Sequence, residues 1–133
     1  MSKKKGDRRE SLGVDIFENA GFTVETPNHV KFSNKDYFNL MDFMAVHPNT
    51  KVIFVQVKSE TARNIREFEE QCKEIFSSEH TIVYYLVYHK REGWRLIEID
   101  LDNGTHTVVA DGRDSTDNMG VHITNYLQEN LTN

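Results

Sequence analysis

The middle of the chain carries two apolar segments, residues 38–46 and 51–58, joined by a short Pro-Asn-Thr sequence. Proline and asparagine between two apolar runs are typical of a turn, so the pattern predicts two antiparallel strands in a hairpin. Three polar residues interrupt these strands where packing alone favours apolar side chains: Asp42 in the first, and Gln56 and Lys58 in the second. The interruptions are the first indication of a functional site.

The three polar side chains are expected to meet. Side chains two residues apart on a strand point to the same face, so Gln56 and Lys58 emerge together. Asp42 lies beside them if the turn sets that register, and the backbone carbonyl of Val57 offers a further oxygen. Magnesium and similar divalent cations take oxygen ligands. The spacing therefore predicts a metal site with a lysine beside it.

Hydrophobic periodicity predicts alternating helices and strands along the rest of the chain. In chain order we expect a helix over 6–19, a strand over 22–26, a short extended piece over 30–34, the central hairpin, a helix over 61–77, strands over 81–89, 94–101 and 105–110, and a helix over 117–131. Gly13 weakens the first helix, because a glycine inside a helix costs about 1 kcal/mol relative to alanine.

Residues 81–89 form a continuous apolar run rich in strand-forming residues, which is typical of a buried central strand. A strand, a helix and a second strand in succession predict that 51–58 and 81–89 pair in parallel through a right-handed crossover. Cys72 falls on the apolar stripe of the intervening helix, which indicates a small core residue and not a nucleophile. The pattern as a whole predicts an α/β fold with a central mixed sheet flanked by helices.

The central motif resembles that of a known enzyme family. Asp42, thirteen intervening residues and then Gln56-Val57-Lys58-Ser59 are similar to the core of the PD-(D/E)xK nuclease superfamily, in particular to archaeal-type Holliday-junction resolvases and restriction-endonuclease relatives. That family also carries a glutamate on its first helix, about three turns before a Gly-Phe pair. Here Glu10 precedes Gly21-Phe22, and the resemblance covers residues 3 to 90 of the sequence.

The resemblance implies a restriction-endonuclease-like three-layer fold and metal-dependent hydrolysis of phosphodiester bonds, with Mg²⁺ or Mn²⁺ as cofactor. Asp42, the Gln56 side-chain oxygen and the Val57 carbonyl would bind the metal. Glu10 would act through water or on a second ion, and Lys58 would hold the attacking water. Lowering the pKa of that water and stabilising charge on the phosphate are the expected contributions of the metal.

Two positions depart from the family pattern. Met41 stands where the family's name expects proline, and Gln56 stands where the acidic ligand is usually found. A glutamine has no negative charge, so we expect a weaker cation site, which needs more metal and favours manganese. Substitution of Gln56 by glutamate is then expected to tighten metal binding.

The leading functional hypothesis is a structure-selective DNA endonuclease that resolves junctions as a homodimer, since two strands must be cut and twofold pairing is the commonest way to supply two sites. The alternatives are a restriction- or repair-type nuclease on duplex DNA, and a non-catalytic nucleic-acid-binding module of the same fold. Salt-sensitive binding without cleavage favours the last of these.

Composition and charge modify this picture. At 133 residues the chain is expected to form one domain, and its net charge is −5. The first nine residues carry +4, which leaves −9 on the remaining residues. We expect residues 1–9 to form a mobile basic arm that contacts the DNA backbone through its basic side chains: Lys3, Lys4, Lys5, Arg8 and Arg9. Ser59 either assists a phosphate contact or caps the helix that follows it.

The single cysteine leaves no internal disulfide partner, and no apolar run reaches the length of a membrane span. These features favour an intracellular, cytoplasmic protein, and the resemblance implies that it is associated with DNA. One rival metal site is an acidic ladder of Glu98, Asp100 and Asp102, although such alternation is more typical of a solvated strand face. The six histidines show no zinc-binding spacing.

Overall fold

The computed structural model describes residues 2–27, 37–38, 40–59, 65–89, 92–112 and 119–131, with side chains from residue 9 onward. Three helices and six strands are formed in these ranges. In chain order they are α1 (Ser2–Asn19), β1 (Thr23–Glu25), β2 (Phe43–Val46), β3 (Val52–Ser59), α2 (Ile65–Ile75), β4 (Thr81–His89), β5 (Gly93–Asp100), β6 (Thr105–Asp111) and α3 (Val121–Leu131).

The six strands form one sheet in which the spatial order follows the chain order, from β1 to β6. Neighbouring strands pair antiparallel except β3 and β4, which pair in parallel across α2. This confirms the predicted hairpin between β2 and β3, and it confirms the parallel pairing of β3 with β4. The hairpin register places Phe43 opposite Val55, which fixes where the residues before β2 lie along β3.

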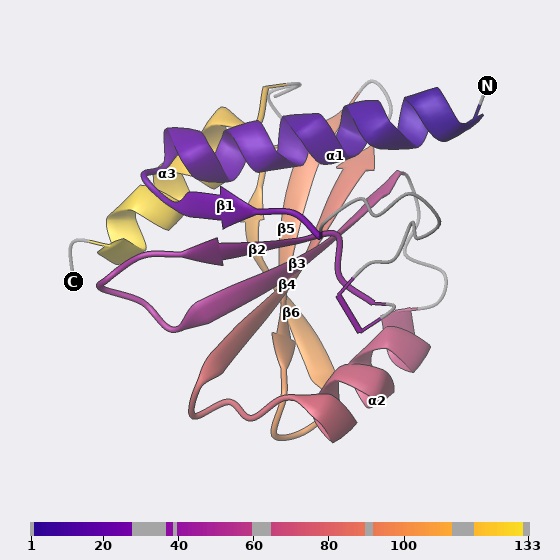
Figure 1. Cartoon of the computed structure of the whole chain (residues 1–133), viewed down its shortest axis with the longest axis vertical. Coiled ribbons are helices and arrows are strands. Elements are labelled where there is room, and N and C mark those ends of the chain that lie inside the picture. Colours follow the sequence, from indigo (N-terminus) through magenta and orange to yellow (C-terminus); the bar gives the residue numbers. More distant parts are fainter. Residues whose placement is uncertain are drawn as a thin grey trace.

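Helices cover both faces of the sheet, so the molecule has three layers (Figure 1). On one face α1 and α3 pack on a core that includes Phe17, Phe43, Val55, Leu86 and Trp94. On the other face α2 packs on a second core that includes Met41, Phe68, Cys72, Val83 and Tyr85. Because β4 contributes to both cores, it needs apolar residues at successive positions, which explains its continuous apolar run.

Two element starts differ from the prediction. The first helix begins at Ser2 and not near Gly6, so the residues predicted as a basic arm continue α1; lysine and arginine have high helix propensity, which permits this. The second strand begins at Phe43 and not at residue 38, because Tyr37 and Met41 form an isolated bridge around a turn. Phe38 in this turn has a φ of 57°, a left-handed conformation that is incompatible with an extended strand.

Other differences are small or lie outside the described ranges. The second helix ends at Ile75 and not at residue 77. The predicted extended piece over 30–34, the start of the second helix at 61–64 and the start of the last helix at 117–118 lie outside the described residues.

Gly13 sits where α1 approaches the sheet most closely. A methyl group at this position would lie 3.1 Å from Val57 Cγ2, 3.3 Å from Leu86 Cδ2 and 3.4 Å from Phe43 Cε2. The loss of helix propensity at a glycine is therefore offset by the close packing that it permits. The contact brings the middle of α1 against Val57 in the second half of β3.

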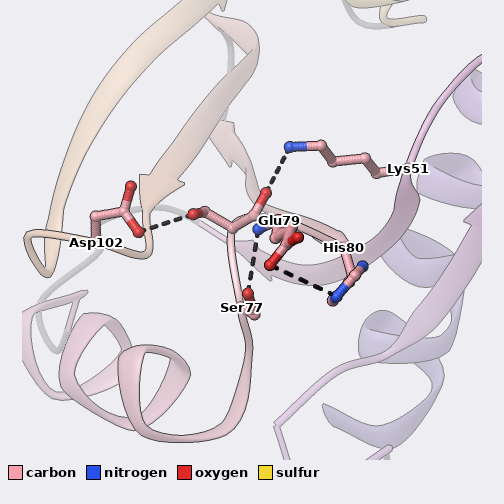
Figure 2. Close-up of polar contacts among 6 residues, drawn as sticks. Lys51, Ser77, Glu79, His80 and Asp102 are labelled. Atoms are coloured by element: carbon pink, nitrogen blue, oxygen red, sulfur yellow. Dashed lines mark hydrogen bonds and ion pairs between the residues drawn. The ribbon is translucent and has the colours of Figure 1, made fainter.

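The end of the sheet where β3 and β4 begin is joined by polar contacts (Figure 2). The Ser78 hydroxyl donates to the Asp102 carboxylate at 2.7 Å, and the Lys51 ammonium donates to the Ser78 carbonyl. Glu79 N donates to the Ser77 hydroxyl at 3.2 Å. These contacts tie the loop before β4 to the β5–β6 turn and to the start of β3, at the opposite end of β3 from its two polar residues.

Cys72 is fully buried in the second core, and burial raises the pKa of its thiol to about 12. The prediction of a core cysteine is confirmed, because a thiol with so high a pKa carries almost no thiolate near neutral pH. Within the described ranges, no helix is both long and apolar enough to span a membrane.

Gly120, which immediately precedes α3, provides a stability test of the packing between α1 and α3. Its φ is 74°, and a methyl group there would lie 2.3 Å from Cδ1 of the buried Ile16. We expect Gly120→Ala to destabilise the protein by about 2–4 kcal/mol, from the left-handed backbone and the overpacking together. The measurement is urea unfolding followed by circular dichroism.

Gly104→Ala is the matched control. Gly104 has a φ of 70°, but the nearest side-chain atom, Lys73 Cδ, would lie 3.4 Å from the added methyl group. Only the backbone cost of about 1–2 kcal/mol is then expected. Equal losses for the two variants would contradict the proposed overpacking against Ile16.

Candidate metal centre

Asp42 lies at the end of the β2–β3 hairpin pairing, immediately before β2. Its backbone N–H donates to the Val55 carbonyl at 2.8 Å, and its Oδ2 accepts a hydrogen bond from Val57 N at 2.7 Å. The residue is only 9% exposed. The carboxylate is therefore held beside the backbone of β3, level with the residue between Gln56 and Lys58.

The Val57 carbonyl faces the same edge as Asp42. In a strand, the N–H and C=O groups of one residue point toward the same neighbouring strand. Since Val57 N–H points to the Asp42 carboxylate, the Val57 carbonyl also points to that side, beyond the first paired residue of β2. The Val57 side chain is buried in the core under α1, so only its backbone is available to the site.

Gln56 and Lys58 share a small cavity on the face covered by α2. The cavity has a volume of about 210 Å³ and is lined by Leu40, Gln56, Lys58, Glu67, Phe68, Gln71 and Tyr85. The Gln56 Oε1 atom is buried and has no hydrogen-bond partner among the residues that the structure describes. An unpaired buried amide oxygen is costly, which makes it a natural ligand for a cation or a donor.

Glu10 approaches from the other face of the sheet. It is half-buried on α1, one turn before Gly13, which packs on Val57. This places Glu10 toward the C-terminal end of β3, but it does not line the cavity that holds Gln56 and Lys58. Gln56 and Lys58 thus share the cavity, and the Asp42 carboxylate lies on the Val57 backbone between them without lining the cavity, while Glu10 lies on a different layer.

The predicted phosphate-contacting residues are only partly described. The side chains of Lys3, Lys4, Lys5 and Arg8 lie outside the described part of the structure. The Arg9 guanidinium lies 3.8 Å from the centre of the Tyr88 ring, a cation–π contact, and the side chain is half-buried. Arg9 therefore packs on the sheet. Ser59 is exposed at the end of β3.

Two residues of α2 that line the cavity were missed by the sequence analysis. The apolar stripe that predicts a core position for Cys72 gives no role to the polar residues of the same helix. Glu67 and Gln71 are one helical turn apart and flank Phe68, so both reach the cavity beside that buried ring. The sequence signal that could have indicated them is a pair of polar residues four apart on the border of an apolar stripe.

The sequence analysis also missed an interaction that holds α2 on the sheet. Glu69 is buried on α2, and its Oε2 lies 2.8 Å from Nδ1 of His106 on β6. A buried carboxylate needs such a partner, because an unpaired one is expensive to desolvate. The contact fixes the rotation of α2 about its axis and so helps to set where Glu67 and Gln71 lie.

The acidic ladder on β5 serves local structure. The Asp100 carboxylate accepts hydrogen bonds from the Asn103 side chain and from the backbone N–H groups of Asn103 and Asp102, which lower its pKa. Asp102 accepts from the Ser78 hydroxyl. Burial, followed by the neighbouring Asp100 charge, raises the pKa of Glu98. Two of the three carboxylates therefore stabilise turns.

The charge of the candidate metal centre is low. Within the residues that the structure describes, no group of three histidine, cysteine, aspartate or glutamate side chains is placed to hold a metal ion. The oxygens at the edge of β3 are one carboxylate, one amide and one backbone carbonyl, with the Lys58 ammonium nearby. Such oxygen donors suit a hard divalent cation, but their single negative charge makes the site weak.

The hydrogen bond between Val57 and Asp42 gives a stability prediction. Asp42→Ala leaves the Val57 N–H without its acceptor, and we expect a loss of about 1–3 kcal/mol. Asp42→Asn keeps an oxygen acceptor in the same place, so its free energy of unfolding should be close to that of the parent protein. Chemical denaturation of both variants makes the comparison, and an alanine variant as stable as the asparagine variant would show that the bond contributes nothing.

The raised pKa of Glu98 gives a pH-dependent prediction. When folding raises the pKa of a carboxyl group, the group destabilises the folded state at any pH above its pKa in the unfolded chain. This cost disappears at low pH, where the group is protonated in both the folded and the unfolded state. We therefore expect Glu98→Gln to have a higher Tm than the parent near pH 7 and the same Tm near pH 3. Glu18→Gln, an exposed control on α1, should show no such pH dependence.

Comparison with known proteins adds no assignment to this geometry. No protein-family model, no curated protein and no solved structure matches the chain.

Proposed function

We propose that this protein is a metal-dependent DNA endonuclease with a restriction-endonuclease-like fold. The observation that carries the proposal is the position of the Asp42 carboxylate, which binds the backbone of β3 between Gln56 and Lys58. The β2–β3 register gives neighbouring positions to an acid, an amide and a lysine, which supports a shared site. The mixed sheet with helices on both faces is consistent with the three-layer fold that the resemblance implies.

The donor set fits an oxygen-ligated divalent cation. The buried Gln56 Oε1 has no hydrogen-bond partner, the Val57 carbonyl faces the Asp42 side, and Asp42 is fixed by its bond to Val57 N–H. Asp42, Gln56 and the Val57 carbonyl would hold Mg²⁺ or Mn²⁺. The bound ion would supply Lewis-acid activation of a water molecule and neutralise charge on the phosphate.

The remaining residues have distinct roles in this proposal. Lys58 would orient the attacking water and place a fixed positive charge beside the phosphate as negative charge builds up on it. The water oxygen forms a new bond to phosphorus, and the bond between phosphorus and the oxygen of the departing DNA strand breaks. Glu10 would act from the α1 side of the sheet edge, through water or a second ion.

The substrate is proposed to be DNA, with a branched junction as the leading candidate and a homodimer as the active form. An acidic body of net charge −9 can still bind DNA through local contacts at the basic end of α1, because affinity depends on the phosphates that are neutralised nearby. The low charge of the metal site favours a restricted activity that needs high metal concentration.

The test is cleavage of a labelled four-way junction and of a matched linear duplex, with Mg²⁺, with Mn²⁺ and with a chelator. We expect metal-dependent cleavage at symmetric positions of the junction. Asp42→Asn should reduce the rate by roughly 100-fold or more, because it removes the carboxylate that is held beside the backbone of β3. Asp15→Asn, which changes an exposed carboxylate on α1, is the control and should retain parent activity.

The outcomes separate the candidate functions. Equal cleavage of both substrates would retain the nuclease and exclude junction selectivity. Salt-sensitive DNA binding with no cleavage under any metal condition would overturn the catalytic proposal in favour of a binding module.

A further inference from the structure

The candidate metal centre has one carboxylate on the strand side, that of Asp42, and α2 offers a second. Glu67 lies in the first turn of α2 and lines the same cavity as Gln56 and Lys58. The cavity of about 210 Å³ separates β3 from α2, so residues from the two elements face one another across it. A carboxylate is thus present on the wall opposite the amide.

The charged groups of the cavity are not paired with each other. Neither the Lys58 ammonium nor the Glu67 carboxylate forms an ion pair in the part of the chain that the structure describes. Opposite charges that line one small cavity without contact leave room between them for a polar ligand. The buried, unpaired Gln56 Oε1 adds an oxygen that needs a positive or hydrogen-bonding partner.

Glu67 is also free to move toward such a ligand. It is exposed, and a glutamate side chain has three rotatable bonds, whereas Glu69 two residues later is buried and held by His106. The Glu69–His106 contact fixes the helix itself, while Glu67 keeps its side-chain freedom. The fixed helix sets where Glu67 lies, and its side-chain freedom allows the carboxylate to turn toward a cation that enters the cavity.

We propose that Glu67 supplies the second carboxylate of the metal centre, across the cavity from Gln56. The inference rests on the proposed function and specifies its metal site: the ion is bound in the cavity by the Gln56 oxygen of β3 and by Glu67 of α2. The Asp42 carboxylate lies beside the cavity on the Val57 backbone, does not line it, and completes the site from the β2 side. The site then carries two negative charges from two separate layers of the fold. Gln71 lies one turn beyond Glu67 and supports it as a hydrogen-bond partner for metal-bound water.

A purely structural role for Glu67 makes a different prediction. A glutamate in the first turn of a helix stabilises it through the helix dipole by about 0.3–1 kcal/mol. That role affects the stability of α2 but does not affect the affinity of the folded protein for a metal ion. Direct measurement of metal binding therefore separates the two roles.

The experiment is a titration of the full chain with Mn²⁺, followed by electron paramagnetic resonance of the free ion, without DNA. We expect Glu67→Gln to weaken Mn²⁺ binding by roughly tenfold or more, since even outer-shell changes cost metal sites 10–100-fold. Glu70→Gln is the matched control, because Glu70 is exposed on the same helix and does not line the cavity. It should bind Mn²⁺ as the parent does.

A charge-swap variant tests the position of the carboxylate. Gln56→Glu combined with Glu67→Gln moves the negative charge from α2 to β3 across the same cavity. We expect the double variant to recover most of the affinity lost in Glu67→Gln, and Gln56→Glu alone to bind more tightly than the parent. Circular dichroism confirms that each variant is folded before the titration.

The outcomes distinguish this inference from the proposed function. Loss of Mn²⁺ binding in Asp42→Asn with no change in Glu67→Gln would overturn the role of Glu67 and leave the metal centre in place. A parent protein that binds no Mn²⁺ would overturn the metal centre itself. Weakened binding in Asp42→Asn and Glu67→Gln, recovery in the charge-swap variant, and no change in Glu70→Gln support the inference.

Discussion

The parallel pairing of β3 with β4 is the constraint on which the rest of the structure depends. Two parallel neighbours cannot be joined by a tight turn, so the chain must cross the sheet through α2. The crossover covers one face, and the other face must then be buried by elements from the two ends of the chain, which are α1 and α3. Three layers follow from this one pairing, with the carboxyl end of β3 between the N-terminal part of α1 and the first turn of α2.

The candidate metal centre lies where the regular pairing of β2 with β3 ends. Beyond Phe43, the Asp42 carboxylate takes the place of a strand carbonyl as the acceptor for Val57 N–H. One side chain therefore satisfies a backbone donor and presents a negative charge at the edge of the sheet. This dual use explains why a charged residue is tolerated at a position that is only 9% exposed.

Polar contacts hold α2 and the loop after it in place on the sheet. The Glu69–His106 pair connects α2 to β6, and the contacts of Lys51, Ser78 and Asp102 connect the loop after α2 to β3 and to the β5–β6 turn. Since the residues of these contacts lie on separate elements, α2 is fixed at several points. The cavity between α2 and β3 consequently has one wall from each element, and its lining depends on the orientation of the helix.

The sequence by itself determined the strands, the crossover and the local part of the site. Periodicity is a property of neighbouring residues, so it located β3, β4, β5 and β6 closely, and it placed Gln56 and Lys58 on one face. Only the tertiary structure decided which layer each side chain joins: Glu10 lies on the α1 side, Arg9 packs on Tyr88, and Glu67 turns toward the cavity. The physical reason is that helix rotation and the close approach at Gly13 are set by contacts between residues far apart in the chain, which no local pattern records.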